Sequence, residues 1–407
     1  MTVKWKKKEK LKPQVILEKM YAIRLGSSET GLSYNAFDYY EVMAVLLGIL
    51  SFPPRCDGLD HESILSKAIK DLSAKGELHE QCVIEEINRI VNQQLATPEE
   101  TFSILTSISL EVPAPIRSIV VEKTNIRILS KGYPKKYVSR TSFLDRINRK
   151  EKTPEKYAKV IVSVKDRSPR GAERKASNSL NLLRSAFCFN ANTDLEIFGG
   201  DQWSPINKIR LGEVHTVHRN RGNVFEDMFW YEPNFKKTMP CKFQNPKTFT
   251  HNTKWVLGNI EELKYRKVMK ESLIRFVRAL DESDQNLAII KLWSALEVLT
   301  IPSGSNYDLL TRRCAFLFSE YEYHHQVLEQ IREYRNSNVH TGEENDQAKS
   351  YCFLLQKYYR ELVHFHLRQP EKFKSLDEAN GFLDLPTSKS KLLDKKQLIE
   401  RAIVFRK

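Results

Sequence analysis

The segment Asn286–Leu299, with the sequence NLAIIKLWSALEVL, determines the fold of the C-terminal part of this chain. Apolar residues occupy most sides of the helix that this segment predicts, and Pro302 ends it. Neighbouring segments with helical periodicity begin near residues 260, 308, 323 and 348, and the connections between them are short. Four to five helices joined by short loops predict a bundle.

The sequence before residue 256 predicts a different architecture. Its predicted elements are helices at 34–50 and 61–95, strands at 118–121, 126–129 and 160–164, a helix at 172–187, and strands near 195–198 and 209–214. A chain of 407 residues fits two domains. The predicted fold class is therefore α+β, with an N-terminal mixed α/β domain in residues 1–255, an all-α bundle in 256–370, and a tail with a helix in 371–407.

Composition places the chain among folded proteins of a reducing compartment. Hydrophobic residues make up 41% and aromatic residues 10%, so a sizeable core can form. The six cysteines form no close pair, which argues against a zinc site and against a disulfide framework. The longest apolar run, residues 42–50, is far shorter than the ~20 residues that span a bilayer, and the basic N-terminus lacks a signal core. We therefore expect a cytoplasmic protein without a membrane partner.

The net charge of +14 is unevenly distributed along the chain. Residues 122–184 hold 18 Lys and Arg against 6 Asp and Glu, a net charge of +12. Such a block favours a polyanion, although it is also compatible with a solvated surface. The residues predicted to bind RNA are Lys131, Lys135, Lys136, Arg140, Arg146, Arg149 and Lys150. Frequent aromatic residues between 203 and 255 either stack unpaired bases or form the core of a β-rich layer.

The stretch Arg335–His340, with the sequence RNSNVH, carries the candidate chemistry. Arginine stays charged and histidine exchanges a proton near neutral pH, so the two suit chemistry on a phosphodiester without a metal. Positions five apart on an α-helix differ by about 140°, whereas Asn336 and His340 share a face. Arg335 must therefore reach around the helix, or the last turn must distort before Gly342.

Glu297 is the exception in the otherwise apolar segment Asn286–Leu299. A buried carboxylate needs a positive partner. Arg335 is one option, Arg312 or Arg313 is another, and an exposed position is the third. If Glu297 pairs with Arg335, it supports the candidate catalytic set.

Metal and cofactor sites are not expected. The other histidine pairs are His215 with His218, His324 with His325, and His364 with His366. None has a neighbouring cluster of cysteines or carboxylates, and we expect His324 and His325 to be exposed. The chain also lacks a phosphate-binding glycine loop, a Gly-x-Ser-x-Gly motif and a His-Glu-x-x-His motif, which disfavours ATPase, serine hydrolase and zinc protease activities.

The order of the C-terminal segments resembles the HEPN superfamily, and within it the ApeA-like branch. The residues that carry this resemblance are LWSALE at 292–297, the pair Arg312–Arg313 on the next helix, YRNSNVHTG at 334–342, and a last helix rich in Tyr and Leu. The resemblance covers about residues 260–367, a little over a quarter of the chain.

This resemblance implies a bundle that forms a homodimer and acts as a metal-independent endoribonuclease. By analogy, His340 assists attack of the 2′-hydroxyl or protonates the leaving 5′-oxygen, Arg335 binds the scissile phosphate, and Asn336 orients one of them. The product is a 2′,3′-cyclic phosphate. The resemblance also implies a toxin-like effector of antiphage defence, whose N-terminal domain senses a trigger or holds RNA. A phage-derived component or a nucleic acid is the expected trigger.

Two other functions are compatible with the same bundle. One is a non-catalytic RNA-binding or scaffold protein that uses the bundle for dimerisation. The other is a toxin silenced by an adenylylating nucleotidyltransferase, in which a tyrosine lies two residues after the histidine. Here that position is Gly342, which disfavours the second alternative.

Overall fold

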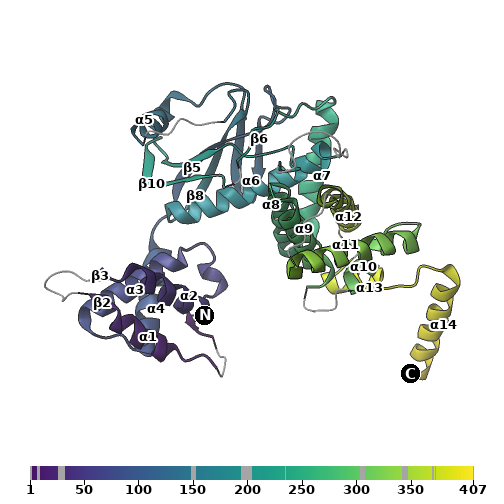
Figure 1. Ribbon diagram of the computed structural model, residues 1–407, viewed down its shortest axis with the longest axis horizontal. Coiled ribbons are helices and arrows are strands. Elements are labelled where there is room, and N and C mark those ends of the chain that lie inside the picture. The colour runs from purple at the N-terminus through teal and green to yellow at the C-terminus, as the bar shows by residue number, and fades with distance from the viewer. Residues whose placement is uncertain are drawn as a thin grey trace. The chain divides into compact units, whose positions relative to one another are not determined.

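The computed structural model describes residues 2–6, 10–25, 33–147, 153–193, 204–233, 235–302, 308–341, 347–368, 371 and 373–406. The chain contains both sheets and many helices (Figure 1), so the predicted α+β fold class is confirmed. Contacts divide it into two compact units. The first comprises Met1–Ile104, Ser163–Ala176 and Val217–Met228, and the second comprises Leu105–Val162, Ser177–Thr216 and Phe229–Lys407.

The first unit is mainly helical. Its helices are α1 (Pro13–Ala22), α2 (Ala36–Ile49), α3 (His61–Lys75) and α4 (Glu80–Ala96), with a 3-10 turn η1 (Pro54–Cys56). Two small antiparallel sheets join β1 (Lys4–Trp5) to β4 (Leu50–Ser51) and β2 (Arg24–Leu25) to β3 (Ser33–Tyr34). The side chain of Asp60 accepts a hydrogen bond from the Ser63 amide and caps α3, and Gly76 ends that helix with a φ of 76°. The helices predicted in this part of the chain are therefore confirmed.

A six-stranded sheet has the strand order β10-β9-β5-β8-β7-β6. Its strands are β5 (Glu100–Ile108), β6 (Ser118–Val121), β7 (Thr124–Leu129), β8 (Ala158–Asp166), β9 (Val214–Arg219) and β10 (Val224–Tyr231). The strands β6 and β7 pair as an antiparallel hairpin, and Glu122 and Lys123 at its turn both have positive φ. A two-residue hairpin turn matches the twist of its strands in this way. The strands predicted between 118 and 164 are thus confirmed.

Other predictions around this sheet have different outcomes. The helix predicted at 172–187 is α6 (Pro169–Ala191). The strand predicted at 209–214 is wrong, because Leu211 makes only an isolated bridge to Ile108 before β9 begins. The strand predicted at 195–198 lies outside the described residues. A 3-10 turn η2 (Lys135–Tyr137) and a short helix α5 (Ser139–Arg146) were not predicted.

The C-terminal helices form the predicted bundle. They are α7 (Pro246–Glu262), α8 (Arg266–Leu280), α9 (Gln285–Thr300), α10 (Asp308–Ala315), α11 (Tyr321–Thr341), α12 (Ala348–Arg368) and α13 (Leu376–Leu383). The helix α9 packs against α8, α10, α11 and α12 (Figure 1). Leu292, Trp293 and Leu296 on it are fully buried, and Asp284 caps its first turn. The apolar segment of the sequence is therefore the buried central helix of the bundle.

One helix boundary in the bundle was predicted wrongly. The helical segment predicted to begin near residue 260 contains parts of two helices, because the chain leaves the helical conformation between Glu262 and Arg266. The first of them, α7, begins at Pro246, within the aromatic stretch 203–255 for which base stacking or a β-rich layer was expected. The side chain of Asn245 accepts a hydrogen bond from the Thr248 amide and caps this helix. Pro246 suits the first turn, because the backbone N–H that proline lacks would have no partner within the helix there.

The division between the two units does not fall at the predicted boundary between residues 255 and 256. Within the second unit, contacts join residues on both sides of that position. Arg184 on α6 forms an ion pair with Asp281 at the end of α8, with 2.6 Å between Nη2 and Oδ1. The Asn207 amide donates to the Leu280 carbonyl over 3.0 Å. Both contacts join a segment before residue 255 to the end of α8, so the predicted boundary does not separate the two parts.

The predicted tail has two helices with different environments. The helix α13 belongs to the bundle, because Asp384 after it pairs with Arg313 and Asn380 donates to the Leu299 carbonyl. The last helix, α14 (Lys389–Phe405), has no buried residue. Among the described helices, none is long and apolar enough to cross a bilayer.

Candidate active site

The helix α11 carries all three residues of the candidate catalytic set. It remains helical through His340 to Thr341, so its last turn does not break before the histidine. Arg335 donates a hydrogen bond from Nη1 to Oδ1 of Asn336 over 3.0 Å. The guanidinium group therefore lies beside the side chain of Asn336. The side chain of His340 lies outside the described residues.

Glu297 pairs with Arg335 across the interface between α9 and α11. Its Oε1 lies 3.7 Å from Nη2 of Arg335, and the two side chains are 26% and 19% exposed. The guanidinium carbon also lies 5.9 Å from the ring centroid of Trp293, one helical turn before Glu297. The prediction that Glu297 pairs with Arg335 is therefore confirmed. The alternative partner Arg313 instead donates to both carboxylate oxygens of Asp384.

The electrostatics of Glu297 reflect its partial burial. Desolvation raises the pKa of its carboxyl group above the usual value. The charge of Arg335 opposes this shift, as do the nearby indole N–H of Trp293 and the charge of Arg275. Because burial outweighs these partners, the carboxyl group retains a proton to higher pH than a solvated glutamate.

We expect Glu297→Gln to stabilise the protein more at pH 7 than at pH 4. A raised pKa in the folded state means that protonation of Glu297 favours folding. The stability that the protonated group contributes is complete below its pKa in the unfolded state, and it is lost as the pH rises through its pKa in the folded state. Glutamine imitates the protonated group at every pH. The melting temperature of the variant minus that of the wild type should therefore increase with pH, as measured by thermal melts at steps between pH 4 and 7.

The matched control is Glu271→Gln, at an exposed residue that pairs with Arg275 on α8. This control reports the loss of a surface ion pair. A melting-temperature difference for Glu297→Gln that shrinks as the pH rises would contradict the assigned pKa direction.

Neighbouring residues hold α11 in place beside the ion pair. The hydroxyl of Tyr334 donates to Oδ1 of Asn286 on α9 over 2.7 Å. The ring of Tyr334 also meets that of Tyr351 on α12 edge to face, with 4.9 Å between centroids. Trp293, Asn286 and Tyr351 were not predicted from the sequence as supporting residues. The four-residue spacing of Trp293 and Glu297 was the available signal, since it places them on one helical face.

The basic residues predicted to bind RNA separate into three groups. Lys131, Lys135, Lys136 and Arg146 are exposed on and around η2 and α5. Arg140 is buried, which is a correction to its prediction as a surface contact. Arg149 and Lys150 lie outside the described residues.

Arg140 is buried by contacts with other residues of the fold. Its Nε donates to Oγ1 of Thr216 and its Nη2 to the Val214 carbonyl, both over 3.2 Å. Its guanidinium carbon lies 5.2 Å from the ring centroid of Tyr133. These contacts join α5 to β9, so this arginine is occupied by the fold. The density of basic residues in the sequence did not distinguish it from its exposed neighbours.

The aromatic residues between 203 and 255 mostly pack against each other or against the core. Phe229 meets Phe143 on α5, and Phe243 stacks on the buried Phe249. This placement favours the core interpretation for those rings over base stacking. Trp230, Tyr231 and Phe235 of this group line one pocket.

The other histidines have individual partners. His215 lies 3.3 Å from Glu232, and His218 contacts the Gly222 carbonyl. His366 contacts the hydroxyl of Tyr265 over 2.8 Å. The prediction that His324 is exposed is wrong, because it is buried against Tyr358. Among the described residues no cluster of histidine, cysteine and carboxylate groups could hold a metal ion.

Comparisons of the chain with protein-family models, with curated proteins and with solved structures found no match. The resemblance to the HEPN superfamily therefore rests on the quoted residues of the sequence alone.

Proposed function

We propose that this protein is a metal-independent endoribonuclease whose catalytic residues are Arg335, Asn336 and His340. The observation that carries this proposal is the arrangement of the Arg335 guanidinium group. It contacts Glu297, Trp293 and Asn336, while its side chain keeps 19% of its surface exposed. A cation that is oriented by neighbouring side chains and still reaches solvent is suited to bind a phosphate.

The proposed reaction is a transesterification within RNA. The 2′-oxygen attacks the adjacent phosphorus, the bond to the 5′-oxygen breaks, and a 2′,3′-cyclic phosphate and a 5′-hydroxyl result. His340 either accepts the proton of the 2′-hydroxyl or donates one to the leaving 5′-oxygen. Arg335 stabilises the charge that builds on the phosphate oxygens, and Asn336 holds the guanidinium group in position.

Glu297 is a positioning residue in this proposal. Its ion pair with Arg335 limits the orientations of the guanidinium group, and its helix is anchored at the centre of the bundle. The exposed Lys131, Lys135, Lys136 and Arg146 supply positive charge for contacts with an RNA backbone. The role in antiphage defence, the homodimer and the phage-derived or nucleic-acid trigger follow from the HEPN resemblance and belong to the same proposal.

Cleavage of total cellular RNA in EDTA tests the proposed activity. We expect the full-length protein to cut RNA in the presence of the chelator and to leave 2′,3′-cyclic phosphate ends, because neither proposed catalytic group requires a metal. The measurement is gel analysis of the RNA with chemical mapping of the ends. A double variant, Arg335→Ala/His340→Ala, purified in parallel, controls for contaminating ribonuclease.

Equal cleavage by the double variant would refute the proposal. If neither protein cleaves although both are folded, the non-catalytic RNA-binding or scaffold function becomes the better account. RNA binding by the intact protein, measured separately by a gel-shift assay, would then support that alternative.

A further inference from the structure

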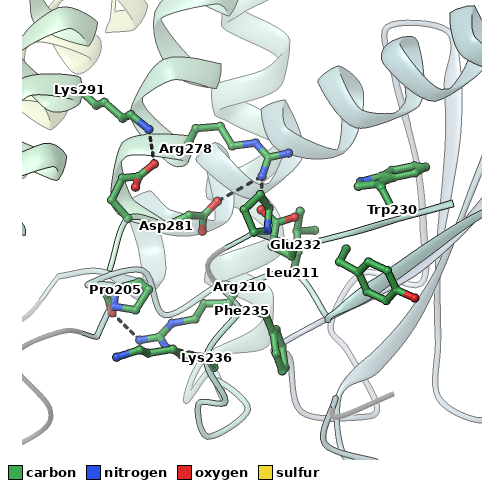
Figure 2. A pocket seen from close by; sticks show the side chains of 13 residues that line it. Pro205, Arg210, Leu211, Trp230, Glu232, Phe235, Lys236, Arg278, Asp281 and Lys291 are labelled. Carbon is green, nitrogen blue, oxygen red and sulfur yellow. Dashed lines mark hydrogen bonds and ion pairs between the residues drawn. The ribbon is translucent and has the colours of Figure 1, made fainter. Parts of the chain in front are cut away.

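A second candidate site lies in the second unit and shares no residue with the catalytic set. It is a pocket of about 440 Å³ between the end of β10, the segment that follows it, and the helices α8 and α9 (Figure 2). This volume lies in the range typical of small-molecule sites. Three aromatic residues and four cations line it: Trp230, Tyr231, Phe235, Arg210, Lys236, Arg278 and Lys291.

The charged groups of this pocket are arranged with the carboxylates deeper than the cations. The side chains of Glu232 and Glu282 are 12% and 11% exposed, whereas those of Arg278 and Lys291 are 36% and 44% exposed. Each carboxylate pairs with one of these cations: Arg278 with Glu232 over 2.5 Å, and Lys291 with Glu282. The buried carboxylates therefore form ion pairs with the cations on the protein side, and the cations remain accessible to a ligand in the pocket.

Glu232 stays ionised at neutral pH and keeps Arg278 in place. Burial opposes its ionisation, but the neighbouring imidazole of His215, 3.3 Å away, and the charge of Arg278 outweigh burial and lower its pKa to about 2. Both ion pairs of Arg278, with Glu232 and with Asp281, involve Nη1. The fork of an arginine has five N–H donors, so Nε and Nη2 can donate to oxygens of a bound anion.

The aromatic side of the pocket supplies a surface for a flat ring. Trp230 stacks on His215 with 4.9 Å between ring centroids and an angle of 21°, which restrains the indole as part of the wall. Figure 2 shows Trp230 and Phe235 across the pocket from Lys291. Aromatic walls bind nucleobases by stacking, whichever base is present.

We propose that this pocket binds a nucleoside phosphate, with its base against Trp230 and Phe235 and its phosphate on Arg278 and Lys291. Inorganic phosphate alone would leave the aromatic wall without a stacked ring, and a nucleoside alone would bring no phosphate to the accessible side of Arg278 and Lys291. A ligand with both parts satisfies both sides of the pocket.

The position of Lys291 connects this pocket to the helix of the candidate active site. Lys291 lies on α9, six residues before Glu297, and α9 also carries Trp293. A ligand on Lys291 would therefore contact the helix that orients Arg335. The binding proposal itself is independent of the proposed nuclease activity, and its test measures binding alone.

Isothermal titration calorimetry, in which each probe is titrated into the full-length protein, tests the proposal. The probes are the four ribonucleoside 5′-monophosphates, the four triphosphates, adenosine and inorganic phosphate. We expect at least one nucleotide to bind about tenfold or more tightly than adenosine and inorganic phosphate, because it uses both sides of the pocket. Lys291→Gln should weaken that binding about tenfold through loss of a charge-assisted contact, and Trp230→Leu should do so through loss of stacking.

Lys267→Gln is the matched control, since Lys267 is an exposed lysine on α8 that does not line the pocket. Circular dichroism of each variant establishes that it is folded. The proposal is overturned if no nucleotide binds to the folded protein at millimolar concentration, or if inorganic phosphate binds as tightly as every nucleotide. It is equally overturned if Lys291→Gln and Trp230→Leu both leave nucleotide affinity unchanged.

Discussion

Replacement of His340 by alanine is expected to slow RNA cleavage about 10²- to 10⁴-fold, the range typical of losing a general acid or base. The helix α11 should persist, because alanine is a better helix former than histidine. Single-turnover cleavage rates at saturating protein measure the effect on the chemical step, and a gel-shift assay measures RNA binding separately. Binding should change much less than the rate, since the proposed role of His340 is proton transfer.

Arg335→Lys extends the same test to the phosphate contact. Lysine keeps the positive charge but lacks the planar fork that contacts Glu297 and Asn336. We expect a loss of roughly 10²- to 10³-fold, as for the removal of one oriented donor to a developing negative charge. A chemical step that depends on charge alone would instead survive this substitution.

Two positions on α11 provide matched controls for these variants. His325 is a half-buried histidine that lies 3.5 Å from Glu329, and Arg332 pairs with Asp308 and Glu329. His325→Ala and Arg332→Lys should therefore leave the cleavage rate within a few-fold of the wild type. Equal losses in the controls and in the candidate catalytic variants would indicate damage to the helix instead of to the chemistry.

Arg184→Met is expected to lower the free energy of unfolding by about 3–5 kcal/mol, the cost of breaking a buried ion pair from one side. Arg184 is fully buried. Its Nε and Nη2 donate to the Ile209 carbonyl, its Nη1 donates to Asn181, and its Nη2 pairs with Asp281 over 2.6 Å. Methionine fills similar space but leaves the Asp281 carboxylate and the Ile209 carbonyl without these donors. Urea denaturation followed by circular dichroism measures the change.

The exposed ion pair of Arg275 with Glu271 gives a control of the same chemistry at the surface. Arg275→Met should change the free energy of unfolding by about 0–1 kcal/mol, because solvent screens the interaction of exposed charges. If Arg184→Met had an effect as small as the control, the contacts of Arg184 would contribute little net stability, and the contribution proposed here would be wrong.

Much of the architecture was predictable because periodicity and turn chemistry are local. The apolar segment 286–299 predicted the central helix, which the structure bounds at Gln285 and Thr300. The β-branched runs between 118 and 164 predicted three strands of the sheet. The start of α7 was missed because its signals are an asparagine cap and a proline, and the aromatic composition around them favoured a β-rich layer.

The candidate site was predicted only in part. Arg335, Asn336 and His340 follow one another on a single helix, so their relation depends on helix geometry and could be argued from spacing. The partner of Glu297 could not be chosen from the sequence, because Arg312, Arg313 and Arg335 all lie on helices predicted in the same bundle. Packing of α9 against α11 decided the choice in favour of Arg335.

The sequence by itself determined the α+β class, the bundle around residues 286–299 and the order of the candidate catalytic residues, because these depend on helical and strand periods. Only the tertiary structure decided which charged residues are buried. Arg140 and Arg184 belong to the same basic block as the exposed Lys135 and Lys136, yet they lie inside the fold. Burial of a charge depends on partners that come from distant segments, such as Asp281 for Arg184, and the linear sequence does not place these partners.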